Sequence, residues 1–480
     1  MTLDQRQTPL FDKLKQFSQQ RPMSFHVPGH KNGHVFPKDA RKYFSEILPI
    51  DLTELTNLDD LHAPHGVIKE AERLAKQYFN TMHTYFLIGG STVGNLAMIL
   101  ATCSEGETVI VQRNSHKSIM NGLEMAKANP VFIAPSYDKH MYRYTHPRIE
   151  TLKQAIKDHP ETKVLILTYP DYFGHTYALK EMIQLAHAHE IIVLIDEAHG
   201  VHFSLGEPFP PSALELGADI VVQSAHKMAP AMTMASFLHV NSSRVSKNRL
   251  SHYLQMLQSS SPSYPLLASL DIARYFLANL TSEDIEKTLQ SVNEIRSMLK
   301  SLPYCEVLPI IKGDDPTKLT LHVEGISGYE IAKLFEQEGI YPELATHNQV
   351  LFIHGLHPFN RLDDLKKSLN RLKLQLKSHS NHDTIDVTNL FPSNVQSLAL
   401  SYQMMNTLQV NNVSFKQAIG YVAAEAIIPY PPGIPLILKG ETITEEHITI
   451  MEQLIKQGAN FQQRKRPTTM NVFTDVKEKK

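Results

Sequence analysis

The chain has 480 residues, of which 42% are hydrophobic and 20% charged, and its formal net charge is −2. A chain of this length buries a sizeable core in two or three domains. Because the charge is almost balanced, no global field attracts nucleic acid or an anionic membrane, and neither is expected as a partner. The N-terminus lacks the apolar core of a signal peptide, no run of 18 apolar residues exists, and only two cysteines are present. These features predict a protein of the reducing cytoplasm.

Residues 1–60 are expected to form an N-terminal arm. Apolar residues have helical spacing from Pro9 onward, and a segment rich in turn formers follows. Pro28 and Gly29 break any regular face in that segment, which also contains His26, His30 and His34. Metal binding is therefore not expected, because a metal needs a defined set of ligands.

Residues 61–280 alternate helical and strand-like runs and are expected to form a large α/β domain. The apolar runs at 164–167 and 191–195 are continuous, which is typical of strands covered on both faces and predicts a mostly parallel sheet. Ligands bind such sheets beyond the carboxyl ends of the strands. The expected helices are 68–79, 93–103, 118–128, 149–158 and 180–189, and the expected strands are 108–112, 131–134, 163–168, 191–195 and 219–223.

A glycine-rich turn, Gly89-Gly-Ser-Thr-Val-Gly-Asn, precedes one of these helices. Glycines allow close backbone approach, and a helix N-terminus offers free N–H groups and a positive dipole end, so the turn suits a phosphate. Ser91 and Thr92 would add hydroxyl groups. The turn is not a Walker loop, because no Gly-Lys-Ser/Thr follows. The alternative is an ordinary glycine turn with a helix cap.

Two further polar clusters follow expected strands. His116, in Arg113-Asn-Ser-His-Lys-Ser, could stack on a cofactor ring or could be an ordinary loop histidine. Asp196, in Asp-Glu-Ala-His-Gly, follows a buried strand, where a carboxylate is costly unless paired. A protonated pyridine nitrogen would pair it. A helicase interpretation of Asp-Glu-Ala-His needs an upstream phosphate loop that the chain lacks.

Lys227 follows the strand at 219–223, within Ser224-Ala-His-Lys. Desolvation lowers the pKa of a buried amine, and the free amine can form a Schiff base with the aldehyde of pyridoxal 5'-phosphate (PLP). The alternative is a lysine whose ammonium reaches solvent. A phosphate turn, a ring-stacking histidine, an aspartate and a lysine in this order together describe PLP.

Beyond residue 240 the pattern changes. Residues 254–267 form a polar turn between helices, and Ser259, Ser261, Ser263 and Tyr264 could reach a phosphate. A small α/β domain is expected at 281–374, with helices at 284–300 and 328–338 and strands at 319–323 and 350–354. Residues 378–389 are expected to be a linker. A final module covers 390–480, with a proline-rich segment from Pro429 between helical segments that is either a pocket wall or a stiff turn.

Five motifs jointly resemble the bacterial ornithine/lysine/arginine decarboxylases, which have PLP fold type I, the aspartate-aminotransferase-like fold. They are Ser224-Ala-His-Lys, Asp196-Glu-Ala-His-Gly, Arg113-Asn-Ser-His-Lys-Ser, Ser261-Pro-Ser-Tyr-Pro and Pro429-Tyr-Pro-Pro-Gly-Ile-Pro-Leu. The resemblance runs from about His26 to Glu441 and is closest to the short biosynthetic type without an N-terminal wing domain. Two positions depart from the family pattern: Gly89-Gly-Ser replaces Asn-Gly-Thr, and Ala225 replaces a threonine.

The resemblance implies α-decarboxylation of arginine, lysine or ornithine to agmatine or a diamine and CO2, within polyamine biosynthesis. It implies that Lys227 binds PLP covalently, that Asp196 pairs with the pyridine nitrogen and that His116 lies on the ring face. The phosphate would lie near Ser91, Thr92, Val93, Ser224 and His226. Family members are dimers or larger, with active sites at the interface between subunits.

Two assignments stay open within this scheme. Lys227 or His199 could return the proton to the α-carbon. Glu441 could bind the cationic side chain of the substrate, or could be a surface acid that caps a helix. Other PLP reactions, such as transamination or carbon–carbon lyase chemistry, are alternatives, as is a catalytically silent regulatory relative.

Overall fold

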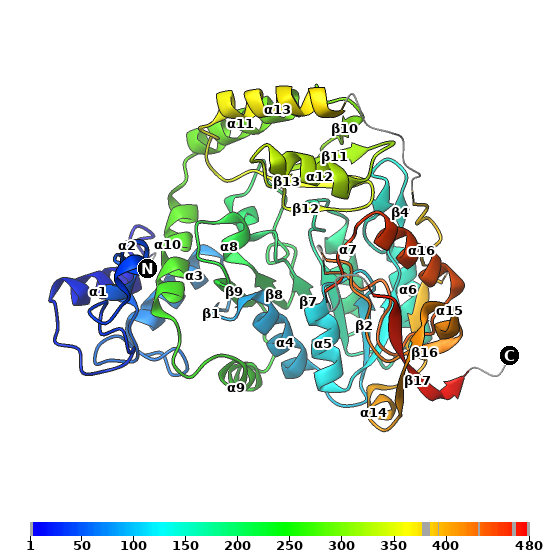
Figure 1. The fold of residues 1–480 in the computed structure, drawn as a ribbon. Helices are drawn as coiled ribbons and strands as arrows, with labels where there is room; N and C mark the ends of the chain where they lie inside the picture. The colour runs from blue at the N-terminus through cyan, green and yellow to red at the C-terminus, as the bar shows by residue number, and fades with distance from the viewer. Residues whose placement is uncertain (1–2, 377–384, 392, 431–432, 463–466, 478–480) are drawn as a thin grey trace. The chain divides into compact units, whose positions relative to one another are not determined.

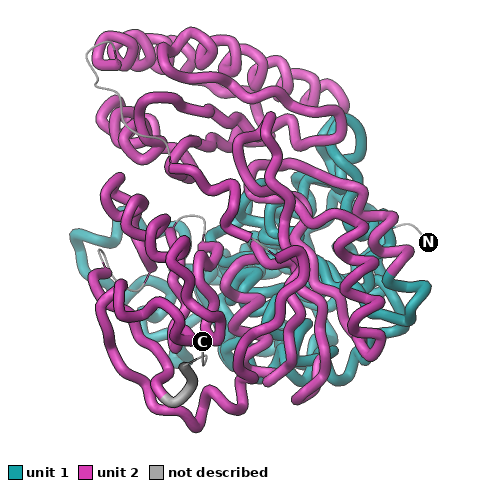
Figure 2. The backbone as a smooth tube through the Cα atoms, turned by 90° about the vertical axis from the view of Figure 1, so that its right-hand side faces the viewer, with its two compact units in different colours: residues 1–102, 186–281 teal, residues 103–185, 282–480 magenta. Residues whose placement is uncertain are grey.

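A computed structural model of the chain describes residues 3–376, 385–391, 393–430, 433–462 and 467–477 (Figure 1). The chain divides into two compact units (Figure 2). Unit 1 contains residues 1–102 and 186–281, and unit 2 contains residues 103–185 and 282–480. Each unit is therefore assembled from two stretches that are far apart in the sequence.

Unit 1 contains four adjacent strands in the order β1-β9-β8-β7. Strands β7 and β8 are parallel, as the sequence predicts, and β9 runs antiparallel to both β8 and β1. Helix α4 (Gly90–Thr102) contacts all four strands. The strand bounds are β1 (His83–Leu87), β7 (Ile192–Asp196), β8 (Ile220–Gln223) and β9 (Ser236–Val240).

Strands β1 and β9 were not predicted from the sequence. Thr84 of β1 and His239 of β9 lie opposite each other in the antiparallel register, and the threonine hydroxyl lies 2.9 Å from Nδ1 of the histidine. Both side chains are fully buried. Each strand thus carries a buried polar residue that interrupts its apolar pattern. The two segments can be recognised as strands only when these two residues are known to bind each other.

The N-terminal arm belongs to unit 1. Helix α1 (Pro9–Gln19) lies where the apolar spacing predicts it and contacts α3 (Val67–Tyr78) and α10 (Tyr264–Asn279). The polar turn predicted at 254–267 does separate two helices but is shorter than predicted, since α9 (Lys247–Leu257) ends and α10 begins within that range. The short elements of this unit are α2 (Lys38–Phe44), η1 (Leu48–Ile50), η2 (Val201–Leu205) and α8 (Ala225–Met228).

Unit 2 contains four adjacent strands in the order β6-β2-β3-β14. Strand β2 is parallel to β3 and β6, as predicted, and β14 pairs antiparallel with β3. The bounds are β2 (Thr108–Gln112), β3 (Asn129–Ile133), β6 (Val164–Thr168) and β14 (Val395–Ser397), with helices α5 (Lys117–Ala126), α6 (Ile149–Asp158) and α7 (Leu179–Ala188). The two-stranded ribbon β4 (Tyr137–Asp138) and β5 (Arg143–Tyr144) lies in the same stretch.

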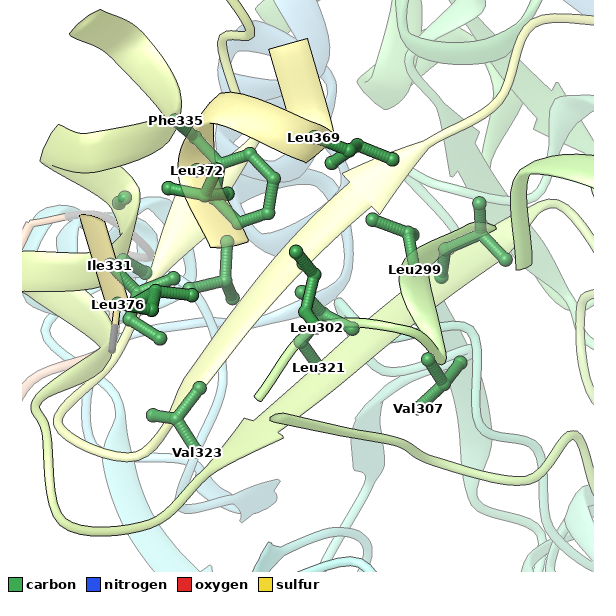
Figure 3. Close-up of a cluster of buried hydrophobic side chains, with 14 of the residues drawn as sticks. Leu299, Leu302, Val307, Leu321, Val323, Ile331, Phe335, Leu369, Leu372 and Leu376 are labelled. Atoms are coloured by element: carbon green, nitrogen blue, oxygen red, sulfur yellow. The ribbon is translucent and has the colours of Figure 1, made fainter. Parts of the chain in front are cut away.

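A second sheet of unit 2 has the antiparallel order β10-β11-β13-β12. Its core contains Ile331 and Phe335 of α12 and Leu369, Leu372 and Leu376 of α13, all drawn in Figure 3. The predicted elements at 284–354 are present. The bounds are α11 (Ser282–Leu299), β10 (Cys305–Val307), β11 (Lys318–Val323), α12 (Gly328–Gln337), β12 (Leu344–Ala345), β13 (Gln349–Ile353) and α13 (Leu362–Leu376).

The last part of unit 2 has a sheet in the order β15-β17-β16, with bounds β15 (Val410–Ser414), β16 (Tyr421–Ala423) and β17 (Thr469–Lys477). Its helices are α14 (Tyr402–Met405), α15 (Phe415–Ala418) and α16 (Glu445–Lys456). The predicted helix before the proline-rich segment is wrong, because strand β16 leads into it and Ile427 bridges to Ile437. Most of the predicted linker, residues 378–384, lies outside the described residues.

Candidate functional site

Lys227 lies in α8, directly after β8, and its amine lies 3.0 Å from Nε2 of His199. His199 follows β7 and is 4% exposed, whereas Lys227 is half-buried. Two residues from the ends of neighbouring parallel strands therefore meet, as the strand-end rule predicts. An amine and an imidazole in this contact can exchange a proton.

Asp196 is the last residue of β7 and is 3% exposed. Its Oδ2 accepts a hydrogen bond of 2.9 Å from Nδ2 of Asn95, and its Oδ1 accepts one of 3.2 Å from the backbone N–H of Ala198. The buried carboxylate is thus held in one orientation by a side chain and by the backbone. Neutral donors fix the direction of the carboxylate without neutralising its charge.

The glycine-rich turn enters α4 at Gly90, whose φ is +75° and whose N–H donates to the carbonyl of Met234 at 2.8 Å. A left-handed φ favours glycine at this position. A Cβ on Gly89 would collide with the side chain of Val93. Ser91 and Thr92 lie in the first turn of α4, where backbone N–H groups lack helical partners.

Ser224, between β8 and α8, is fully buried, and its hydroxyl has no hydrogen-bond partner among the described residues. A buried hydroxyl without a partner is costly, and an anion at this position would supply the missing acceptor. His226 instead has a protein partner, because its Nδ1 lies 3.0 Å from the carbonyl of Ala235. Ser224 is thus the position in this segment that has an unmet hydrogen bond.

His116, the ring-stacking candidate, belongs to unit 2. It precedes α5, and its Nδ1 contacts the hydroxyl of Ser118 at 2.8 Å and accepts a bond of 3.3 Å from the same residue's N–H. A Cβ on Gly433 would approach the ring of His116 to 3.2 Å. The histidine is therefore a helix cap whose ring lies against the backbone of the proline-rich segment.

Glu441, the candidate substrate acid, is 4% exposed, so its interpretation as a surface acid is wrong. It forms an ion pair of 2.8 Å with Arg113, also within unit 2. Its oxygens accept further bonds from the N–H of Leu438 at 2.8 Å and the amide of Gln396 at 3.2 Å. Both oxygens thus have protein partners, and a role in substrate binding stays a prediction.

Asn95 and Arg113 lie within motifs of the sequence, but no role was predicted for either residue. Asn95 is the one amide in an otherwise apolar stretch of α4, and it is 1% exposed. Arg113 directly follows a buried strand and is 2% exposed. Buried polar side chains require partners, so a polar residue within or just beyond an apolar run is the signal that could have identified both.

The structure also bears on metal binding and on membrane insertion. Among the described residues, no group of three or more histidine, cysteine, aspartate or glutamate side chains is placed to hold a metal ion. In the same ranges, no helix is long and apolar enough to cross a membrane.

The residues of unit 1 fit PLP. The buried Asp196 carboxylate suits a protonated ring nitrogen, and the Lys227 amine suits the aldehyde. The unpartnered hydroxyl of Ser224 and the N-terminal turn of α4 suit a phosphate. Each of these groups belongs to a strand end or a helix start of the same unit.

The sequence matches two family models. The model described as "Orn/Lys/Arg decarboxylase, major domain" matches residues 8–315, and "Orn/Lys/Arg decarboxylase, C-terminal domain" matches residues 383–464. The chain is 43% identical to the uncharacterized protein YaaO of Bacillus subtilis, over 98% of this chain and 99% of that protein. It is 35% identical to an arginine decarboxylase of Bacillus subtilis, over 100% and 99%. It is 37% identical to an arginine decarboxylase of Halalkalibacterium halodurans, over 95% of each.

Solved structures show the same fold. The lysine decarboxylase LdcF of Francisella novicida superposes with a TM-score of 0.80 at 20% identity, covering 97% of this chain and 81% of that one. The constitutive lysine decarboxylase of Escherichia coli has a TM-score of 0.80 at 18% identity, covering 98% and 82%. These likenesses confirm the predicted PLP fold type I.

Proposed function

The chain belongs to the Orn/Lys/Arg decarboxylase family as a PLP-dependent decarboxylase, and on that premise we propose that it removes the α-carboxylate of a basic L-amino acid as CO2. Arginine is the first candidate substrate, with agmatine as the product. Relatives named arginine decarboxylase are 33–37% identical to the chain, whereas those named lysine decarboxylase are 22–23% identical. The contact between Lys227 and His199 beside Asp196 carries the proposal.

Lys227 would hold PLP, and Asp196 would pair with its ring nitrogen. PLP supplies an electron sink for the pair of electrons that remains when the α-carboxylate departs. Asn95 keeps the Asp196 carboxylate aimed by its bond of 2.9 Å. The Ser224 hydroxyl and the first turn of α4, with Ser91, Thr92 and Val93, would bind the phosphate.

Lys227 and His199 would handle the proton that replaces CO2. Their nitrogen atoms are 3.0 Å apart, so a proton on one can pass to the other. His199 is almost fully buried, which limits proton exchange with bulk solvent. As the family resemblance implies, His116 would lie on the ring face of PLP and His226 near its phosphate.

The quaternary proposal is a cytoplasmic homodimer. Apolar side chains of the N-terminal arm are strongly exposed, with Phe25 at 94%, Met23 at 90% and Tyr43 at 74%. Such a concentration of exposed apolar surface in one segment marks an interaction site. Phe25→Ser is expected to weaken the dimer in analytical ultracentrifugation. Tyr341→Ser, at an aromatic of unit 2 that is 77% exposed, should leave it intact, and an unchanged dimer in both variants would contradict the assignment to the arm.

The cofactor test is the visible absorbance band of lysine-bound PLP. Wild type is expected to show the band after incubation with PLP, and Lys227→Ala is expected to lose it. Lys247→Ala, at an exposed lysine of the same unit, should keep it. A folded wild-type protein without the band would favour a silent regulatory relative.

The reaction test measures CO2 release from arginine, lysine and ornithine in turn. Release with agmatine as the product supports the first candidate, and release from another of the three reassigns the substrate. Transfer of the amino group to a keto acid without CO2 would support transamination instead.

A further inference from the structure

The residue that follows Asp196 in the sequence has a buried carboxyl group that the proposed chemistry does not use. Glu197 is the next residue and is fully buried. Its Oε1 accepts from the N–H of Ala213 at 2.7 Å, and its Oε2 lies 2.8 Å from the hydroxyl of Ser212 and 2.6 Å from the amide nitrogen of Gln223. Glu197 therefore joins three separate segments of unit 1.

The hydrogen bonds continue across the strands. The amide oxygen of Gln223 lies 3.0 Å from Nε2 of His239, and Nδ1 of His239 lies 2.9 Å from the hydroxyl of Thr84, which contacts Thr81 at 2.9 Å. Because the Gln223 oxygen can only accept, Nε2 of His239 carries the proton and Nδ1 accepts from Thr84. The chain of bonds runs from the end of β7 through β8 and β9 to β1.

This arrangement is built to be uncharged. Burial raises the pKa of Glu197 to about 8 and lowers the pKa of His239 to about 3, so both are neutral near pH 7. Isolated charges would be expensive at this depth, whereas a fully bonded neutral network is not. The absence of a side chain at Gly200 also leaves room for the side chain of Glu197, because a Cβ on Gly200 would lie 2.6 Å from Cγ of Glu197.

The position of the network in the chain connects it with the site. Glu197 follows Asp196 immediately, and Gln223 is the last residue of β8, four positions before Lys227. The N–H of Glu197 also donates to the carbonyl of Val222 at 2.9 Å. One side chain therefore ties together the ends of the two strands that present Asp196 and Lys227.

We propose that Glu197 is a positioning residue, which sets the separation of Asp196 and Lys227 through its bond to Gln223. The proposal rests on the proposed function, since it assigns Asp196 and Lys227 to opposite ends of one PLP ring. Misplacement by about 1 Å in such a site can cost on the order of a hundredfold in rate. Glu197 would thus affect the rate of the reaction without contacting PLP or the substrate.

Glu197→Ala is the primary test, measured as the PLP absorbance band, the dissociation constant of PLP, and kcat and KM separately. We expect weaker PLP retention and kcat lower by about tenfold or more, with little change in KM, because the lost contact orients PLP rather than the substrate. Asp271→Ala is the matched control, since Asp271 is equally buried in unit 1 but binds the start of α1 and Arg274. It should lower the melting temperature and leave the PLP band unchanged.

Two further variants test the path. Glu197→Gln should rescue PLP retention, because the Gln223 amide can turn over and His239 can move its proton to Nδ1, which reverses every bond in the chain. Glu197→Ala and Gln223→Ala combined should cost much less than the sum of the two single changes, because they remove the same contact.

The outcomes separate cleanly. A wild-type protein without the PLP band overturns the proposed function and the positioning role with it. A wild-type band with normal PLP affinity and kcat in Glu197→Ala, and a fall in melting temperature like that of Asp271→Ala, overturns the positioning role alone. Additive effects of the Glu197 and Gln223 changes would also overturn it.

Discussion

Removing the carboxylate of Glu441 is expected to destabilise unit 2 rather than to impair substrate binding. The side chains of Arg113 and Glu441 are 3% and 5% exposed, and their contact is 2.8 Å. In Glu441→Ala the guanidinium keeps the carbonyls of Pro435 at 2.8 Å and Leu436 at 3.1 Å but loses its only ionic partner among the described residues. Breaking one partner of a buried ion pair costs about 3–5 kcal/mol.

Differential scanning calorimetry measures this cost. For a unit of this size, each kcal/mol shifts the melting temperature by roughly 2–4 °C, so a fall of roughly 10 °C is expected. Glu441→Gln keeps the hydrogen-bond acceptor and should cost less. The double change Arg113→Met with Glu441→Met should recover much of the loss, because it removes both buried charges. Glu452→Ala, at an exposed acid of α16, is the control and should change little.

Kinetics decide between the two roles of Glu441. If it serves as the partner of Arg113, the KM for arginine of the folded Glu441→Ala protein stays near the wild-type value. An unchanged melting temperature together with a large rise in KM would refute the reasoning and would identify Glu441 as the acid that binds the substrate side chain.

Three other predictions follow from the packing. Gly94→Ala should lower stability by about 1–3 kcal/mol, because its Cβ would lie 2.7 Å from Val222 and α4 would have to move away from the strands. Thermal unfolding of Gly355→Ala is the control, because a Cβ there meets open space and the φ of Gly355 is not left-handed. Burial raises the pKa of Glu72 to about 8 from an unfolded value of 4.5, so the folded state holds a proton that the unfolded state has lost. That stabilisation is complete below pH 4.5 and is lost as pH rises through 8. The free energy of unfolding of Glu72→Gln, measured with urea at several pH values, should therefore depend less on pH across this window than that of the wild type. An equal pH dependence in the two proteins would contradict the assignment. Phe335→Ala should cost about 3–5 kcal/mol by opening a cavity in the cluster drawn in Figure 3, while the PLP band of unit 1 persists.

The strands β6 and β7 could be predicted from the sequence because of their continuous apolar runs. A short apolar run of β-branched residues suits a strand covered on both faces, so neighbouring residues are enough to favour that assignment. Asp196 and Lys227 could be singled out in the same way, since Asp196 directly follows an apolar run and Lys227 lies four positions after the end of β8. The turn before α4 was visible through its glycines, whose backbone requirements are also local.

The partners of those residues could not be predicted in this way. Asn95 and Asp196 are separated by 101 positions, and Arg113 and Glu441 by 328. The residues around Asp196 or Arg113 do not indicate which distant side chain will bind it, because the partner depends on strand order and register. Strands β1 and β9 were missed for the same reason. Burial of Thr84 and His239 is favourable only because the two side chains bind each other.

The sequence by itself therefore determined the α/β class and the main strand ends, and it singled out the residues that we propose hold PLP. Periodicity and single costly residues are encoded within a few positions. Only the tertiary structure decided that Asn95 aims Asp196, that His199 meets Lys227, that Glu441 pairs with Arg113, and that Glu197 bridges β7 and β8. A buried polar group must find a partner, but the identity of that partner is set by how the whole chain packs.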